Sequence, residues 1–258
     1  MSLVEVKNIY MNYHTPQGET EALKDISFEI AEGDFISIIG PSGCGKSTLL
    51  NIIAGLIKPS SGTILLEDKE VNGIDERIGY MFQRDYLFEW LSLWDNVTLG
   101  LRIQKRLDAK SKEKIENLLD SYGLSSFKKA YPNELSGGMK QRAALIRTLA
   151  LDPHILLLDE PFSALDYQNR LKVCDDIYQI IKKAGKTVVM VTHDISEAVS
   201  TSSRVIVLSN RPSTIKKEIL LSFDESYDTP LKRRSAPEFR NYFNDIWKEL
   251  DIGEGKSL

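Results

Sequence analysis

The sequence predicts an α/β fold, in which the strands of a sheet alternate with helices, and three stretches of the 258-residue chain carry this prediction. Residues 35–39 form an apolar run rich in isoleucine, typical of a buried strand, and residues 49–54 continue as a helix. A second apolar run, 155–158, ends in two carboxylates, and residues 187–191 form a third. Residues 87–154 have mainly helical patterns. We therefore expect a helical insertion between core strands.

The first strand and the first helix are joined by the segment Gly40-Pro-Ser-Gly-Cys-Gly-Lys-Ser-Thr48. Its pattern, G-x-x-x-x-G-K-[ST], binds nucleoside triphosphates when it lies between a strand and a helix. The glycines let backbone N–H groups point at an anion, and the helix dipole adds positive potential there. Lys46 is expected to reach the β- and γ-phosphates, and the Ser47 hydroxyl to coordinate Mg²⁺. The alternative is a chance match in a glycine turn.

Polar side chains follow three further strands. Gln83 ends the run 77–82, where ligands of open α/β sheets bind, and is a candidate to contact the metal or the attacking water; the alternative is a solvated loop glutamine. Asp159 is the metal candidate, and Glu160 is placed to act as general base for water. His193, after the strand 187–191, is a candidate to bind the γ-phosphate and to orient the water.

Three other features have two interpretations each. Tyr13 either stacks on a base or is a core tyrosine. Ser136 caps a helix whose first residues, Gly137 and Gly138, expose N–H groups, so this helix start is either simply capped or contacts a phosphate from another side. The aromatic segment 86–94 either packs inside the helical insertion or forms a surface for another protein.

Composition argues against a nucleic-acid-binding protein, a membrane-spanning protein and a disulfide-rich secreted protein. The net charge of −4 gives no reason to expect a nucleic-acid partner, whose binders usually carry a basic footprint. No apolar run approaches the roughly 18 residues of a membrane-spanning helix. The chain shows no signal-peptide pattern, and its two cysteines do not suggest a disulfide framework, so we expect a reduced cytosolic setting.

Taken together, these motifs resemble the ATP-binding subunit of an ABC transporter over about residues 3–220. Residues 40–48 match the Walker A loop, Gln83 the Q-loop, 135–141 the signature, 155–160 the Walker B strand, 163–166 the D-loop and His193 the switch histidine. Tyr13 matches the adenine-stacking aromatic. The residues expected to contact ATP are Tyr13, Gly40, Pro41, Ser42, Gly43, Cys44, Gly45, Lys46, Ser47, Thr48, Ser136, Gly137, Gly138 and Asp166.

The resemblance implies a P-loop NTPase (ABC ATPase) core with N-terminal antiparallel strands and a helical subdomain. It implies one nucleotide-binding domain over residues 1–258. Its core would comprise 1–86 and 155–224, its helical subdomain 87–154 with the signature, and its C-terminal helical tail 225–258.

The resemblance also implies a mechanism. Two copies close head to tail around two ATP molecules and Mg²⁺, with Ser136 and Gly138 of each copy reaching the nucleotide of the other. Lys46 and the opposing signature stabilise the γ-phosphate, Glu160 activates water, and His193 holds the γ-phosphate. Ser47, Gln83 and Asp159 would hold the metal. The cassette would act on the cytoplasmic face of the cell membrane, bound to a permease and indirectly to a solute-binding protein.

Within the family, the segment 209–215 and the late helix resemble the nitrate/sulfonate/taurine importer branch. That branch usually has a Leu-Leu-Pro-Trp-like run after the Q-loop, and this chain has Leu87-Phe-Glu-Trp90, without the proline. A pyrimidine precursor therefore stays open as a substrate. The alternative functions are a soluble ABC-type ATPase of DNA repair or translation, and a nucleotide kinase.

Overall fold

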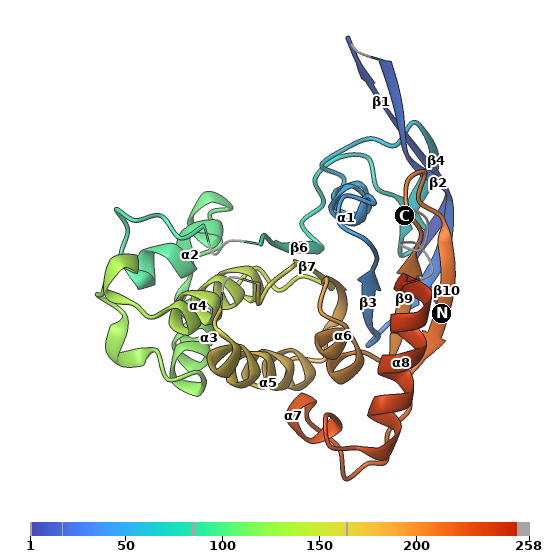
Figure 1. Ribbon diagram of the computed structural model, residues 1–258. Helices are drawn as coiled ribbons and strands as arrows, with labels where there is room; N and C mark the ends of the chain where they lie inside the picture. The colour runs from blue at the N-terminus through green and yellow to red at the C-terminus, as the bar shows by residue number, and fades with distance from the viewer. Residues whose placement is uncertain (1, 17, 84–85, 164, 252–258) are drawn as a thin grey trace.

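The computed structural model describes residues 2–16, 18–83, 86–163 and 165–251 (Figure 1). The expected domain spans residues 1–258, so its first residue and the end of its tail, 252–258, lie outside the described residues, as does Ala164 of the expected D-loop. Two sheets and a group of helices make up the described chain. Among its helices, none combines the length and the hydropathy that a bilayer crossing requires.

The larger sheet has six strands in the order β10-β9-β3-β8-β7-β6. These are β3 (Phe35–Ile39), β6 (Ile78–Met81), β7 (Ile155–Asp159), β8 (Thr187–Val191), β9 (Arg204–Leu208) and β10 (Ile215–Leu220). All are parallel except β10, which pairs antiparallel with β9. Helices cover both faces of such a sheet, which explains why β7 and β8 are almost continuously buried and uniformly apolar.

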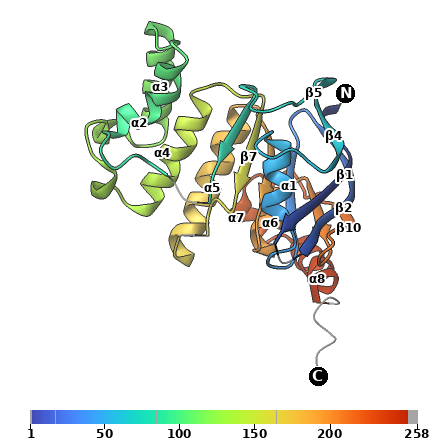
Figure 2. The ribbon, with the colours of Figure 1, turned by 90° about the horizontal axis from the view of Figure 1, so that it is seen from above.

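The second sheet is antiparallel and has the order β2-β1-β4-β5. Its strands are β1 (Ser2–Thr15), β2 (Gly18–Ala31), β4 (Ser61–Leu66) and β5 (Lys69–Glu70). Apolar side chains of β1, β2 and β4 share one core with β3 and with α1 (Lys46–Ile53), so helix α1 is enclosed between the two sheets (Figure 2). The α/β class with N-terminal antiparallel strands is confirmed.

The helical insertion has its own apolar core. It contains α2 (Leu93–Ile103), α3 (Ala109–Ser121), two short 3₁₀ turns (Ser125–Phe127 and Pro132–Glu134) and α4 (Gly137–Leu149). Polar side chains begin each helix as the sequence dictates: Ser92 accepts from the N–H of Asp95, and Asp108 forms a capping box with Ser111. As a separate body of helices, the insertion projects from one side of the larger sheet (Figures 1 and 2).

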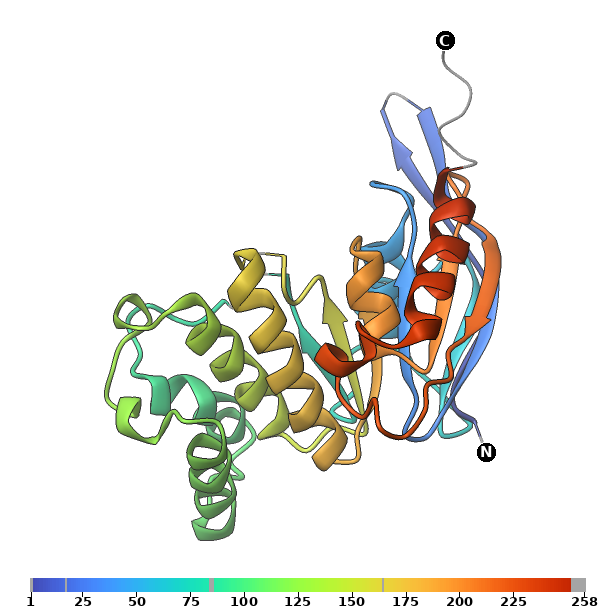
Figure 3. The ribbon, with the colours of Figure 1, turned by 60° about the horizontal axis from the view of Figure 1, so that its bottom comes forward.

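The remaining helices cover the other parts of the larger sheet. They are α5 (Tyr167–Lys183), α6 (Ile195–Thr201), α7 (Pro230–Arg233) and α8 (Pro237–Asp251). Helix α8 lies against α6 (Figure 3), and its fully buried Ile246 joins the apolar cluster of α6 and β9. The C-terminal helix is thus packed onto the core.

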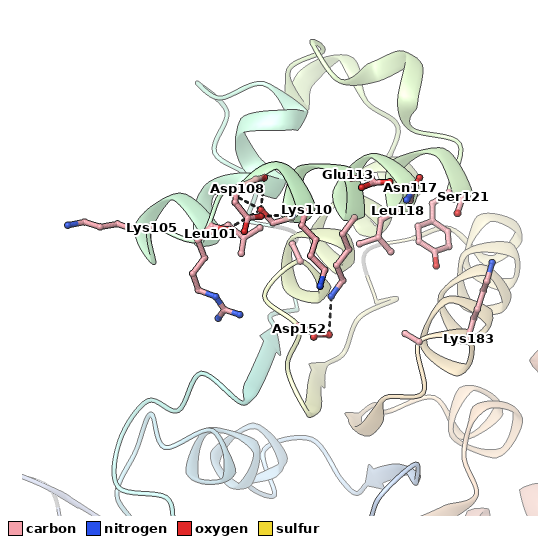
Figure 4. Close-up of a pocket in the computed structure, with 16 residues that line it drawn as sticks. Leu101, Lys105, Asp108, Lys110, Glu113, Asn117, Leu118, Ser121, Asp152 and Lys183 are labelled. Atoms are coloured by element: carbon pink, nitrogen blue, oxygen red, sulfur yellow. Dashed lines mark hydrogen bonds and ion pairs between the residues drawn. The ribbon is translucent and has the colours of Figure 1, made fainter.

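A salt bridge joins the helical insertion to the core beside a surface pocket of about 940 Å³ (Figure 4). Asp152 accepts from Lys114 of α3 at 3.0 Å and from Lys186, next to β8, at 2.9 Å. The Lys186 hydrogen bond, with a contribution from Lys114, lowers the pKa of Asp152 to about 2. One carboxylate therefore holds cations from both parts of the chain.

We expect Asp152→Asn to lower the melting temperature at neutral pH by the equivalent of about 1 kcal/mol or less, because the Asp152 side chain is 59% exposed and the pair is screened by water. The pKa of Asp152 is lower in the folded state than the roughly 3.9 of an unfolded chain, so the bridge stabilises the fold above about pH 4 and is lost as pH falls towards 2. Thermal unfolding of both proteins from pH 7 to pH 3 tests this. A difference that grows as pH falls would contradict it.

The C-terminal helix offers a matched pair of neighbouring residues. Ile246→Ala removes a fully buried side chain and should lower the free energy of unfolding by about 2–5 kcal/mol. Trp247→Ala, on the half-exposed neighbour, should cost roughly 1 kcal/mol or less. Urea unfolding of both variants measures the two values. Equal small losses would show that α8 contributes little to the core.

Candidate functional site

The glycine-rich loop 40–48 connects the carboxyl end of β3 to the first turn of α1. Gly45, the N-cap residue before α1, has φ +112°, a backbone conformation that other residues rarely adopt. A Cβ atom there would lie 2.9 Å from Cδ2 of Leu23, so a larger residue would have to displace that side chain as well as adopt the strained backbone conformation. Cys44 is buried inside this turn. The loop is therefore a tight, preformed curl of backbone above a helix N-terminus, suited to an anion.

Lys46 extends its side chain back over this loop. Its Nζ donates to the carbonyl oxygens of Gly40 at 2.8 Å and Pro41 at 2.9 Å, and the side chain is almost fully buried. Both partners are neutral, so the positive charge of the ammonium is not cancelled by a carboxylate at this point. The loop thus holds a cation at its centre.

Asp159, at the carboxyl end of β7, lies beside the start of α1. The Ser47 hydroxyl donates to Oδ1 of Asp159 at 3.1 Å, and the hydroxyl of Tyr80 on β6 lies 3.3 Å from Oδ2. Burial raises the pKa of Asp159, although these two hydrogen bonds oppose the change. The structure therefore brings the expected metal candidates Ser47 and Asp159 into contact.

This pair fits a magnesium ion, because Mg²⁺ in nucleotide sites takes one or two carboxylates and completes its shell with phosphate oxygens and water. Within the described residues, no group of three or more histidine, cysteine or acidic side chains is arranged to hold a metal. A metal here would therefore depend on the phosphates for its remaining ligands.

Gln83, Glu160 and His193 meet at the same edge of the sheet. The Gln83 amide donates to Oε2 of Glu160 at 3.0 Å, and Nδ1 of His193 lies 3.2 Å from the same oxygen. Glu160 adopts φ +45°, an uncommon backbone conformation for a residue other than glycine. Three strand ends thus place one carboxylate between an amide and an imidazole, a suitable arrangement to polarise water.

Tyr13 is located beside the loop and not in the core. Its hydroxyl forms a hydrogen bond with Oγ1 of Thr48 at 3.1 Å, and its ring is partly exposed. The interpretation of Tyr13 as a core tyrosine is therefore wrong.

The signature segment lies apart from the phosphate loop. Oγ of Ser136 accepts from the N–H of Met139 and caps α4, as expected. Added Cβ atoms on Gly137 and Gly138 would contact Leu165 and Val173, next to and on α5. Helices α1 and α4 lie on opposite sides of β6 and β7 in two views (Figures 1 and 2). The N-termini of α1 and α4, each of which could bind an anion, therefore do not belong to one site within a single copy of the chain.

Asp166 is the N-cap of α5, and hydrogen bonds from the backbone and side chain of Asn169 lower its pKa. This structural role was not predicted.

Two other residues of the site were not predicted from the sequence. Tyr80 contacts Asp159 and accounts for an aromatic side chain in the middle of β6. Arg211 donates from Nε to the carbonyl oxygen of Gly43. In the sequence, the segment 209–215 indicates only a subfamily, so its contact with the loop had no sequence signal.

Known proteins resemble the chain over most of its length. Residues 23–163 match the protein family described as ABC transporter. The chain is 48% identical over 251 residues to an uncharacterized ABC transporter ATP-binding protein, YtlC, of Bacillus subtilis, covering 97% of this chain and 96% of that one. It is 41% identical to the taurine import ATP-binding protein TauB of Jannaschia sp. (95% and 93% covered) and 40% identical to the nitrate import ATP-binding protein NrtD of Synechocystis sp. (94% and 93% covered).

Solved structures agree. The dimeric post-hydrolysis state of the ATP-binding cassette MJ0796, bound to ADP and Pi, has a TM-score of 0.72 and 36% identity to this chain, covering 85% of this chain and 99% of that one. Sequence, fold and the Walker-type loop lead to one conclusion: the chain belongs to the ABC transporter family, as an ATP-binding subunit whose ATPase activity is coupled to transport.

Proposed function

We propose that the chain powers the import of a small solute of the taurine or nitrate kind through a separate membrane-spanning subunit, at the cytoplasmic face of the membrane. The observation that carries this proposal is the match, at 40–41% identity over nearly the whole chain, to ATP-binding proteins named for taurine and nitrate import. These matches favour an importer over the repair, translation and kinase alternatives. A solute-binding protein would deliver the solute to the permease.

Each residue at the sheet edge has a role in this proposal. The loop 40–48 surrounds the phosphates of ATP, Tyr13 stacks on adenine, and Lys46 turns its ammonium from two carbonyls to the β- and γ-phosphates. Magnesium, held by Ser47 and Asp159 with help from Gln83, would neutralise charge on the phosphate oxygens.

Glu160 takes the proton from the attacking water, while Gln83 keeps the carboxylate and the water in place. Nδ1 of His193 faces Glu160, so Nε2 is the ring atom left to face the γ-phosphate, and it donates there when both ring nitrogens carry a hydrogen. Charge then develops on the γ-phosphate between Lys46 and His193, where preorganised donors lower the barrier most.

A second copy of the chain completes each site. Helix α4 lies on the other side of β6 and β7 from α1 (Figure 2), so we expect Ser136, Gly137 and Gly138 at its start to reach a nucleotide on another copy. Asp166 follows Leu165, which a Cβ atom on Gly137 would contact, and we expect Asp166 to approach the opposite nucleotide as well. The related cassette MJ0796 is dimeric in its ADP- and Pi-bound state, which supports such an arrangement for this chain.

The membrane subunit would dock on the aromatic segment that follows Gln83. A groove of about 480 Å³ lies between β6, this segment and α2, lined in part by Phe82, Tyr86, Phe88 and Ile103. Trp90 stands beside it, 73% exposed, with its ring against Phe88 at a centroid distance of 5.1 Å. Large exposed aromatics next to an apolar groove are typical of an interface core.

We expect Glu160→Gln to bind MgATP as the wild type does, to lose at least about a hundredfold in ATPase rate, and to accumulate as an ATP-bound dimer, because the substitution keeps the size of the side chain and removes its basic oxygen. ATPase rates of the assembled transporter and light scattering of the isolated chain measure this. Wild-type turnover would overturn the assignment.

Uptake of labelled taurine and of labelled nitrate by cells expressing the whole transporter tests the solute class. We expect uptake of one of them, and its loss in Glu160→Gln. ATPase activity without uptake of either solute would contradict the proposed substrate class and leave the ATPase intact.

Two tryptophans of the aromatic segment should behave oppositely. Trp90→Ala should leave the melting temperature and nucleotide affinity nearly unchanged and weaken permease binding by about 2 kcal/mol, roughly thirtyfold. Trp94→Ala should instead lower the free energy of unfolding by about 3 kcal/mol, because Trp94 packs against the apolar core of the helical insertion. Pull-down by detergent-solubilised permease and thermal unfolding separate the two. A Trp90→Ala protein that melts far lower, yet binds the permease, would place Trp90 in the core.

A further inference from the structure

Arg170 of α5 connects two loops that border the catalytic edge. Its Nη2 donates to the carbonyl oxygen of Leu165 at 3.0 Å, and its Nη1 donates to Oδ2 of Asp194 at 3.5 Å. Its Nε has no hydrogen-bond partner among the described residues and lies 3.9 Å from Oε1 of Glu197. The side chain is 24% exposed. One guanidinium therefore contacts the loop before α5, the cap of α6 and a residue inside α6.

Glu197 is the buried member of this group. It is 3% exposed, and the hydroxyl of Thr192 donates to its Oε2 at 2.7 Å. A carboxylate removed from water needs a cation, and Arg170 is the cation that contacts it. Burial raises the pKa of Glu197, while Thr192 and Arg170 favour the charged form. Removing Arg170 would leave this carboxylate without its counter-charge.

These contacts hold both neighbours of His193. Thr192, on one side, is bound by Glu197; Asp194, on the other side, is bound by Arg170 and accepts the N–H groups of Ser196 and Glu197. The N–H of Asp194 also donates to the Thr192 hydroxyl at 3.1 Å. The backbone that carries the His193 ring is thus fixed at each end, and the ring reaches Glu160 at 3.2 Å.

We propose that Arg170 and Glu197 form a positioning pair that fixes the loop 192–194, and through it the His193 imidazole, relative to Glu160 and to the loop that ends at Asp166. This inference rests on the proposed role of His193 in hydrolysis. The pair touches neither the loop 40–48 nor Tyr13 in any contact of the described residues. It therefore acts on the rate of the chemical step, and nucleotide binding is independent of it.

The geometry sets the expected effects. A displacement of about 1 Å at a reacting group costs up to about a hundredfold in rate, so Arg170→Ala should lower kcat by roughly 10–100-fold with KM for ATP within about twofold. Arg170→Lys keeps the charge but cannot reach Leu165, Asp194 and Glu197 together, so it should recover part of the loss. Glu197→Gln keeps the volume and the Thr192 contact, and should lose less than Arg170→Ala.

Arg204 supplies a matched control. It lies at the start of β9, at the opposite end of the strands from His193, is 18% exposed, and likewise binds several acceptors, among them Glu218 at 3.0 Å. Arg204→Ala should lower the melting temperature without changing kcat. We would first measure the melting temperature of all four variants in the assembled transporter, and then kcat, KM and MgATP affinity at a temperature below the lowest of these values.

A double-mutant cycle with His193→Ala gives the decisive result. If Arg170 acts through His193, the kcat loss of Arg170→Ala should shrink to less than about twofold in the His193→Ala background. Losses that multiply in full would overturn the proposal, as would an unchanged kcat in Arg170→Ala, or a raised KM at constant kcat. If Arg170→Ala does not fold, the same cycle is run with Arg170→Lys. Failure of the proposed role of His193 has a separate signature, which is normal turnover in His193→Ala alone.

Discussion

The parallel pairing of β3 with β8, and of β8 with β7, is the constraint on which the rest of the molecule depends. In this register the carboxyl ends of the three strands reach one edge, where each continues into a polar segment: the loop 40–48, the pair Asp159 and Glu160, and His193. No single segment contains the site. The site exists because backbone hydrogen bonds, distributed along apolar strands that carry no function themselves, align three distant parts of the chain.

Much of this could be predicted from the sequence. Strands at the centre of a parallel sheet are continuous apolar runs, and the expected bounds of the run 187–191 agree with β8. The lengths of the two N-terminal strands were less predictable, because register shifts and the left-handed residues Asn8 and Asp25 interrupt the alternation of their side chains. The seven-residue helix α6 is too short to show a helical period, and it was missed.

Side-chain partners were less predictable than backbone elements. The patterns that single out Gln83, Glu160 and His193 are local, and the structure brings these residues together. The contacts of Tyr80 and Arg170 depend on which helix crosses which strand end, and no local pattern carries that information. For the same reason the sequence could not separate Trp90, which is exposed, from Trp94, which packs in the helical insertion.

The separation of α1 and α4 on either side of β6 and β7 has a consequence at the level of the cell. If each nucleotide is held by the loop of one copy and the signature of another, every nucleotide site depends on residues of two polypeptides. A copy with a damaged loop and an intact signature would still pair with normal copies and would occupy permeases unproductively. Such alleles would be dominant over the wild type in a mixed population of chains, whereas alleles that prevent folding would be recessive.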